Sequence, residues 1–335
     1  MAPNIQPVLA NNTAPIEAND SSHDSGVDDI KSTISSTQSL TDSIREHVYE
    51  NGRRYHRKSQ GKYALPSDET EQDRLDLSHA YYLEMLDGKL SLAAFNKDPA
   101  NVLDCGTGTG IWALEFGDEH PGSKVVGIDL APIQPDWVAP NVYFELDDLE
   151  KEWTFAENHF DYIHSRNVGA GIRNWERYLR QMYKHCKPGG YVEVSEHCYN
   201  DLDCDDGSMP DDSPFLLYIR TMGQSLEKMG MNPNLDLSGY KRLLADAGFV
   251  DIEAHTFKCP VGSWPREKKQ QRLGAILREI SRTGFEAYGK AVMTNYGGLT
   301  EEKATEMINE CVELVEKGTQ HMYIQQWYLV ARKPE

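Results

Sequence analysis

The 335-residue sequence has few positive charges: 34 Lys and Arg stand against 53 Asp and Glu, which gives a formal net charge of −19. This acidic excess argues against binding nucleic acid through a broad basic face and against docking on anionic lipid. No apolar run approaches the ~20 residues that a membrane helix needs. The amino-terminal stretch has neither the basic start nor the apolar core of a secretory signal. We therefore expect a soluble protein of the cytoplasm or nucleus, with no direct nucleic-acid binding and no membrane contact.

Cysteine is sparse as well. The six cysteines form no CxxC pair and no dense framework, which argues against a structural zinc site and a disulfide scaffold. Residues 201–212 hold six Asp and no basic residue, but they resemble a calcium loop only loosely, because Gly207 comes one place late and no Glu stands at position twelve. We expect no metal site, and we interpret this Asp-rich segment as a mobile lid or an acidic rim over a substrate cleft.

The first 44 residues contain no aromatic residue and carry six acidic residues against one lysine. Between residues 21 and 43, eleven of 23 positions are Ser or Thr. Such a segment buries too little apolar surface to offset its ordering entropy, so the sequence predicts a disordered tail over 1–44 and one folded domain over 45–335. The tail contributes −5 and the Asp-rich segment −6 to the net charge, which leaves an ordinary −8 for the rest.

Two helical or basic stretches precede the main domain pattern. Residues 49–63 interleave aromatics with a basic cluster, Arg53, Arg54, Arg57 and Lys58. This pattern fits a nuclear signal, an anion contact or a helix that packs its tyrosines inward. Residues 71–90 place apolar side chains at helical spacing and predict a core-facing helix.

From residue 100 onward, short apolar runs alternate with helical stretches. Strands are predicted over 102–105, 124–129, 142–146, 160–165, 190–196, the end of 239–257, and 323–332. Helices are predicted over 175–190, where Lys, Pro and Gly supply the stop, over the start of 239–257, and over much of 266–317. This alternation indicates an α/β fold with a doubly wound parallel sheet, in which ligands bind at the carboxyl ends of the strands. The late helical stretch is expected to cover that cleft or a partner surface.

The strongest local signal is VLDCGTGTG at 102–110, a buried strand that runs into a glycine loop and then a helix. Gly106, Gly108 and Gly110 permit positive φ and let a ligand approach the backbone, and the helix amino terminus favours an anionic group. The spacing is GxGxG rather than the GxGxxG of dinucleotide sites.

Acidic residues end the next two strands. Asp129 ends the second strand about 20 residues beyond the glycine loop, where an acid can accept from both ribose hydroxyls. Asp147 and Asp148 end the third strand, where they can accept from an exocyclic adenine amine. Together with the glycine loop, these acids predict an adenosine-containing ligand.

The chain at this point resembles the class I S-adenosylmethionine-dependent methyltransferases and, more narrowly, the fungal LaeA-like methyltransferases. The resemblance runs from about residue 49 to 334, and it is carried by YENGRRYH (49–56), VLDCGTGTGIWALEF (102–116), GIDLAPIQPDWVAPNVYFELDDLEKEW (127–153), FDYIHSR (160–166), HCKPGGYVEVSE (185–196) and YLVARKP (328–334). It implies a Rossmann-like seven-stranded sheet, with helices at the amino-terminal side and a late helical insert over the cleft.

The resemblance also implies roles for individual residues. The glycine loop, with Asp104, Gly106, Thr107, Gly108 and Gly110, would surround the methionine part and ribose of S-adenosyl-L-methionine. Asp129 would bind the ribose hydroxyls, and Asp148, with Asp147 beside it, the adenine. Ser165 and Arg166 would border the methionine end.

Methyl transfer from a sulfonium requires mainly alignment and exclusion of water, and a general base helps only where the nucleophile has a proton to lose. Three strand-end residues face the expected cleft: His164, Glu196 and His197. Of these we take His197 or Glu196 as the candidate catalytic base.

Three functional interpretations stay open at this stage. The leading one is a methyltransferase that acts on a small secondary metabolite or on a protein acceptor, with regulatory protein partners, in the control of secondary metabolism. The second is a non-catalytic subunit of a regulatory, transcription-related complex that keeps the fold. The third, a nicotinamide dehydrogenase, is disfavoured by the GxGxG spacing.

Overall fold

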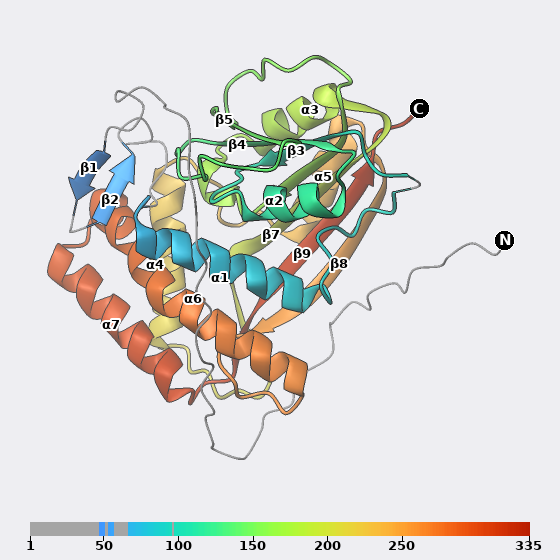
Figure 1. Ribbon diagram of the computed structural model, residues 1–335. Coiled ribbons are helices and arrows are strands. Elements are labelled where there is room, and N and C mark those ends of the chain that lie inside the picture. Colours follow the sequence, from blue (N-terminus) through green and yellow to red (C-terminus); the bar gives the residue numbers. More distant parts are fainter. Residues whose placement is uncertain (1–46, 51–52, 57–65, 96) are drawn as a thin grey trace.

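The computed structural model describes residues 47–50, 53–56, 66–95 and 97–335 (Figure 1). The tail expected over 1–44 lies outside the described residues, as do Arg57 and Lys58 of the basic cluster. In the part of the chain that the structure describes, no helix is long and apolar enough to cross a membrane.

A seven-stranded sheet forms the centre of the molecule (Figure 1). Its strands are β3 (Asn101–Cys105), β4 (Lys124–Asp129), β5 (Val142–Leu146), β6 (Phe160–Arg166), β7 (Cys186–Cys204), β8 (Val250–Pro260) and β9 (Met322–Arg332). The spatial order is β5-β4-β3-β6-β7-β9-β8, and β9 runs antiparallel to both of its neighbours. The predicted α/β class and all seven predicted strands are confirmed.

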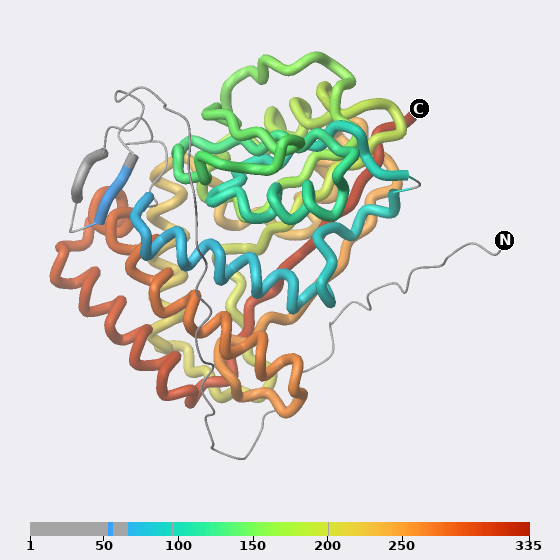
Figure 2. Tube along the Cα trace, in the orientation of Figure 1, coloured from blue at the N-terminus to red at the C-terminus, as the bar shows by residue number. Residues whose placement is uncertain are grey.

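Helices cover the sheet and build a second layer beside it (Figure 2). They are α1 (Glu69–Met85), α2 (Ile111–Glu119), α3 (Trp175–His185), α4 (Pro214–Lys228), α5 (Leu237–Ala247), α6 (Lys268–Val292) and α7 (Glu301–Lys317). A 3₁₀ turn, η2 (Gly169–Gly171), follows β6, and a π-helical turn, η3 (Met293–Gly297), follows α6.

Three apolar clusters hold these layers together. The first packs α3 and α5 on one face of the sheet, and the second packs α2 on the other face. The third joins α1, α4, α6 and α7 into a helical layer next to β8 and β9. Helix α1 lies against α6 and also touches α2, so it spans the space between the helical layer and the glycine-loop end of the sheet (Figure 2).

The fifth strand is longer than predicted at both ends. Helix α3 ends at His185, and Cys186 is already extended, so the Lys-Pro-Gly-Gly run belongs to β7 rather than to the helix. At the other end, β7 pairs with β9 as far as Cys204, which draws the first third of the Asp-rich segment into the sheet. Pairing with neighbouring strands decides where β7 begins and ends, and a local helix-stop signal carries no information about that pairing.

The Asp-rich segment is fastened to the sheet rather than poised over a cleft. Lys258 on β8 donates to both carboxylate oxygens of Asp205 at 2.7 and 3.0 Å. Asp206 pairs with His321, which lowers the pKa of that carboxyl far below its usual range against the effect of burial. None of residues 201–212 lines either cavity described below, so the interpretation as a cleft rim is wrong.

The first part of the basic stretch forms a hairpin rather than a helix. Strands β1 (His47–Glu50) and β2 (Arg53–His56) pair antiparallel. Arg53 donates to both oxygens of Asp68, at 2.6 and 2.7 Å, and Arg54 donates to Glu69 at 2.8 Å. Asp68 also caps α1 by accepting from the backbone N–H of Glu71. These two arginines therefore anchor the start of α1.

Candidate active site

The glycine loop that follows β3 turns sharply into α2. Gly106, Gly108 and Gly110 have φ values of 70, 59 and 83°, a region that side chains with a Cβ rarely adopt. A Cβ on Gly106 would lie 2.6 Å from a methyl carbon of Val168, and a Cβ on Gly110 would overlap the ring of Phe144. Glycine is thus required here both for the turn and for close packing.

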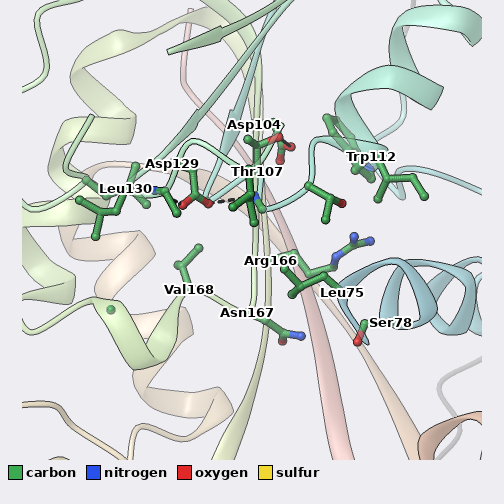
Figure 3. Close-up of a pocket in the computed structure, with 18 of the residues that line it drawn as sticks. Leu75, Ser78, Asp104, Thr107, Trp112, Asp129, Leu130, Arg166, Asn167 and Val168 are labelled. Carbon is green, nitrogen blue, oxygen red and sulfur yellow. Dashed lines mark hydrogen bonds between the residues drawn. The ribbon is translucent and has the colours of Figure 1, made fainter. Parts of the chain in front are cut away.

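Asp129 at the end of β4 holds this loop in place. Its Oδ2 accepts from the backbone N–H of Gly108, and its Oδ1 accepts from that of Ala131, both at 2.9 Å (Figure 3). Burial raises the pKa of Asp129 to about 6, although the backbone donors oppose that shift. Each carboxylate oxygen has a second lone pair, so both can still accept from a ligand.

Asp104, one residue before the end of β3, joins two other polar side chains. It accepts from the hydroxyl of Thr107 at 2.6 Å and contacts Nδ1 of His164 at 2.7 Å. The ring of His164 stacks on Trp112 with a centroid separation of 3.8 Å, and its Nε2 has no protein partner. Asp104 therefore fixes the orientation of both the loop threonine and the β6 histidine.

These residues surround a cavity at the carboxyl ends of β3, β4 and β6, here called the first cavity. Most of the predicted ligand-binding residues line it: Asp104, Gly106, Thr107, Gly108, Asp129, Asp147, Asp148 and Arg166. Gly110 does not, because it is buried behind the loop at the amino-terminal cap of α2.

Ser165 does not line the first cavity either. Successive side chains of a strand point to opposite faces, so Ser165 turns away from its neighbours His164 and Arg166. Its Oγ accepts from the hydroxyl of Tyr178 on α3 at 2.9 Å. The expectation that Ser165 borders the methionine end therefore does not fit its position, whereas Arg166 does line the cavity.

Arg166 lies between α1 and the cavity, near Asn167 and Ser78 (Figure 3). Its guanidinium stacks on the ring of Tyr82 at 4.4 Å, and its Nη2 donates to Nδ1 of His79 at 3.2 Å. Burial, and next the nearby positive charge of Arg166, lower the pKa of His79, which keeps that ring neutral and able to accept.

A second cavity adjoins the first on the side of the helical layer. It is lined mainly by apolar and aromatic side chains from α1, α4, α6 and β7. They include Tyr199, Phe215, Tyr218, Met222, Leu277 and Phe285. Arg74, Ser78, Tyr82, Asn167 and Tyr288 line both cavities. This shared lining makes the two cavities neighbouring parts of one site. The late helical stretch thus covers the cleft, as predicted.

Arg74 lines both cavities and carries a charge at their junction. It donates to both carboxylate oxygens of Glu71 at 2.6 and 2.9 Å and to the hydroxyl of Tyr288 at 3.1 Å. The side chains of Arg74 and Glu71 are 4% and 1% exposed, so this is a fully buried ion pair.

The two candidate bases have different surroundings. His197 lines the second cavity, and its Nδ1 is buried without a protein partner. Burial lowers the pKa of His197 to about 4, so the imidazole is neutral at physiological pH. Glu196 lines neither cavity, and its Oε1 accepts from the backbone N–H groups of Val168 and Gly169. Burial raises the pKa of Glu196 to about 8. Glu196 therefore supports the turn after β6, and His197 alone faces space for a substrate.

The structure combines a mostly parallel sheet, a glycine loop, an acid at the end of each of the next two strands, and an adjoining apolar cavity. This combination is that of a class I, Rossmann-like methyltransferase. The sequence comparisons agree, because residues 77–254 match the family model described as methyltransferase domain.

Curated relatives narrow the group. The chain is 38% identical over 290 residues to methyltransferase pytC of Aspergillus terreus, with 85% of this chain and 88% of the relative covered. It is 33% identical over 252 residues to the secondary metabolism regulator LAE1 of Cochliobolus heterostrophus, with 73% and 81% covered. It is 32% identical over 225 residues to the protein-methionine methyltransferase laeA of Emericella nidulans, with 67% and 60% covered. The chain belongs to the methyltransferase-domain family, and within it to the LaeA-like, S-adenosylmethionine-dependent methyltransferases.

Several residues of the site are not predicted from the sequence. Tyr82 lies in the predicted core-facing helix over 71–90, and Arg74, Asn167 and Tyr288 are not among the predicted site residues. The position of Asn167 directly after the strand that ends in Arg166 was the one local signal for it, since strand ends carry ligand contacts in this fold. The contributions of Arg74 and Tyr288 depend on how α1 and α6 pack, and no local motif reports that.

Proposed function

We propose that the first cavity binds S-adenosyl-L-methionine with its ribose at Asp129. The two oxygens of this carboxylate keep free lone pairs beside the glycine loop, and burial, which raises the pKa of Asp129, leaves the anion poorly solvated. Ribose hydroxyls would donate to these oxygens and replace that missing solvation. Asp148, with Asp147 beside it, would accept from the adenine amine at the end of β5.

The methionine part would extend from the glycine loop toward Arg166. Asp104, Thr107 and Gly108 lie on one side of this path, and Arg166 supplies a cation near the expected carboxylate. When bound, S-adenosyl-L-methionine supplies an electrophilic methyl group on a sulfonium. The chain's own residues hold the ligand, orient it toward the second cavity and exclude water from the junction.

For the acceptor, we propose a small secondary metabolite bound in the second cavity. The observation that carries this proposal is the shared lining of the two cavities, because it places a mostly apolar cavity directly beside the cofactor site. The name of the A. terreus relative, methyltransferase pytC, is in keeping with an enzyme role.

A protein acceptor in a regulatory complex is the second candidate. It is favoured by the names of two relatives, a secondary metabolism regulator and a protein-methionine methyltransferase. Under this alternative, or that of a non-catalytic subunit, regulatory protein partners and a nuclear location would follow. We further propose that residues 45–335 act as a single methyltransferase domain, in keeping with the 290 residues aligned to pytC.

One labelling experiment separates these candidates. The full-length protein is incubated with methyl-labelled S-adenosyl-L-methionine and an extract of fungal cells, and the extract is then divided into protein and small-molecule fractions. We expect label in the small-molecule fraction. Label in protein alone would support the second candidate instead, and no transfer by a protein that binds the cofactor would support the non-catalytic alternative. An Asp129→Asn variant serves as the control for transfer that does not depend on this site.

A further inference from the structure

The second cavity is nearly free of uncompensated charge. The fixed charge in its lining is Arg74, whose guanidinium is paired with the carboxylate of Glu71 through two hydrogen bonds. No Asp or Glu of the described residues lines this cavity. An anionic acceptor would find no available cation there, and a cationic acceptor no carboxylate. Burying an unpaired charge costs far more than burying a polar group, so the lining selects an uncharged molecule.

Three buried polar atoms of the described residues in this lining have no protein partner: Oδ1 of Asn167, Nδ1 of His197 and the hydroxyl of Tyr81. A hydroxyl can donate or accept, whereas Oδ1 only accepts, and Nδ1 accepts when the proton of the neutral ring is on Nε2. Buried polar atoms in folded proteins are nearly always paired, so these atoms beside one cavity indicate a ligand that brings hydrogen-bond donors. Asn167 directly follows the end of β6, and His197 lies within the neighbouring strand β7, two residues beyond Ser195, which is in register with Arg166.

The backbone and neighbours of Asn167 fix its amide. Its φ is 54°, its own N–H donates to the carbonyl of Ser195 at 2.9 Å, and its Nδ2 donates to the hydroxyl of Tyr82. Because the amide nitrogen is used on Tyr82, the carbonyl oxygen remains for a ligand. Asn167 lines both cavities, so that ligand lies at their junction.

We propose that the second cavity binds an uncharged, largely apolar acceptor that carries hydroxyl groups: one becomes methylated and passes its proton to Nδ1 of His197, and a second is held by Oδ1 of Asn167. This inference rests on the proposed cofactor site. The hydroxyl oxygen forms the new bond to the methyl carbon, the electron pair of the broken carbon–sulfur bond stays on the sulfur, and the hydroxyl proton ends on the imidazole. The positive charge of the sulfonium thereby ends on the imidazole of His197, and the net charge of the site does not change in this step.

Binding of simple probes tests the proposal without requiring the natural acceptor. Full-length protein saturated with S-adenosylhomocysteine is dialysed against naphthalene, 2-naphthol, 2-naphthylamine, 2-naphthoate, and 2,3- and 2,7-dihydroxynaphthalene. We expect 2-naphthol to bind about 2- to 10-fold tighter than naphthalene, and the better of the two diols to bind tighter again by a similar factor, one increment for each hydrogen bond. The anionic naphthoate is expected to bind most weakly.

Variants assign each increment to its residue. His197→Phe should abolish the preference for 2-naphthol over naphthalene, and Asn167→Ala should abolish the preference for the diol over 2-naphthol. The matched control is His255→Phe, a strand histidine of β8 that lines neither cavity, and it should keep both preferences.

The outcomes separate this proposal from the cofactor site. If the unmodified protein does not bind S-adenosylhomocysteine, the proposed function itself is wrong. If S-adenosylhomocysteine binds but naphthalene or 2-naphthoate binds as tightly as 2-naphthol, the hydroxyl assignment is wrong, whereas the proposed cofactor site stands. Tighter binding of 2-naphthylamine than of 2-naphthol would overturn it in favour of an amine acceptor. The unmodified protein alone decides these points, so a variant that fails to fold does not remove the test.

Discussion

The replacement of Asp129 by Asn probes the carboxylate at the end of β4 with almost no change in shape. In the native protein each carboxylate oxygen accepts one backbone N–H, from Gly108 and from Ala131. An asparagine has one acceptor oxygen and one NH₂ group. One of the two backbone donors would therefore lose its partner, and the site would lose its negative charge.

The magnitude follows from these lost hydrogen bonds. An unsatisfied buried N–H costs about 1–3 kcal/mol of folding stability, and hydrogen bonds to a charged group contribute about 1.5–3 kcal/mol each to ligand binding. We expect Asp129→Asn to weaken S-adenosylhomocysteine binding by about 10- to 150-fold, since 1.4 kcal/mol corresponds to a tenfold change.

Isothermal titration with S-adenosylhomocysteine measures the affinity, and thermal unfolding monitored by circular dichroism measures the stability. The matched control is Asp118→Asn on α2, an exposed acid that lines neither cavity and should change neither quantity. An Asp129→Asn protein that is folded and binds within twofold of the unmodified affinity would refute the assignment of the ribose to this carboxylate.

Three further predictions concern pH, the glycine loop and the buried ion pair. Burial raises the pKa of Asp129 to about 6, so the ionised carboxylate that accepts the ribose hydroxyls is lost as pH falls through that value. Titrations should therefore show the affinity for S-adenosylhomocysteine falling by up to about tenfold from pH 7 to pH 5 in the unmodified protein, but not in Asp129→Asn. An affinity of the unmodified protein that does not change with pH would contradict this prediction. Gly110→Ala places a Cβ in the ring of Phe144 at positive φ and should lower the free energy of unfolding, measured by denaturant titration, by about 2–4 kcal/mol. Gly88→Ala, at φ 80° in open space, should lower it by only about 1–2 kcal/mol. Equal decreases for the two variants would refute the packing argument. Arg74→Ala leaves the carboxylate of Glu71 buried without its main partner and should cost about 3–5 kcal/mol, and the double variant Glu71→Leu/Arg74→Met should be more stable than that single variant in the same assay.

The sheet was predictable from sequence because its strands are short, apolar and bounded by turn signals. The glycine loop and Asp129 were predictable for a related reason. Each follows or ends a predicted parallel strand, and the carboxyl ends of parallel strands meet at one edge of the sheet. What the local pattern could not supply was the extent of β7, because the pairing of Leu202, Asp203 and Cys204 with β9 joins residues more than 100 positions apart.

The second cavity was unpredictable for the same physical reason. Its lining combines Tyr82 on α1, His197 on β7 and Phe285 on α6, which come together only when the helical layer packs on the sheet. His197 and Glu196 looked equivalent in the sequence, since both end a strand. Their difference lies in the backbone donors of Val168 and Gly169, which engage Glu196 and leave His197 facing the cavity.

A crystal structure of the protein with S-adenosylhomocysteine tests the central claim most directly, because the claim concerns where the nucleoside and its sulfur lie. We predict that the ribose hydroxyls contact the carboxylate of Asp129 and that the sulfur faces the junction lined by Tyr82 and Asn167. A nucleoside bound elsewhere, or a sulfur directed away from the second cavity, would contradict the account.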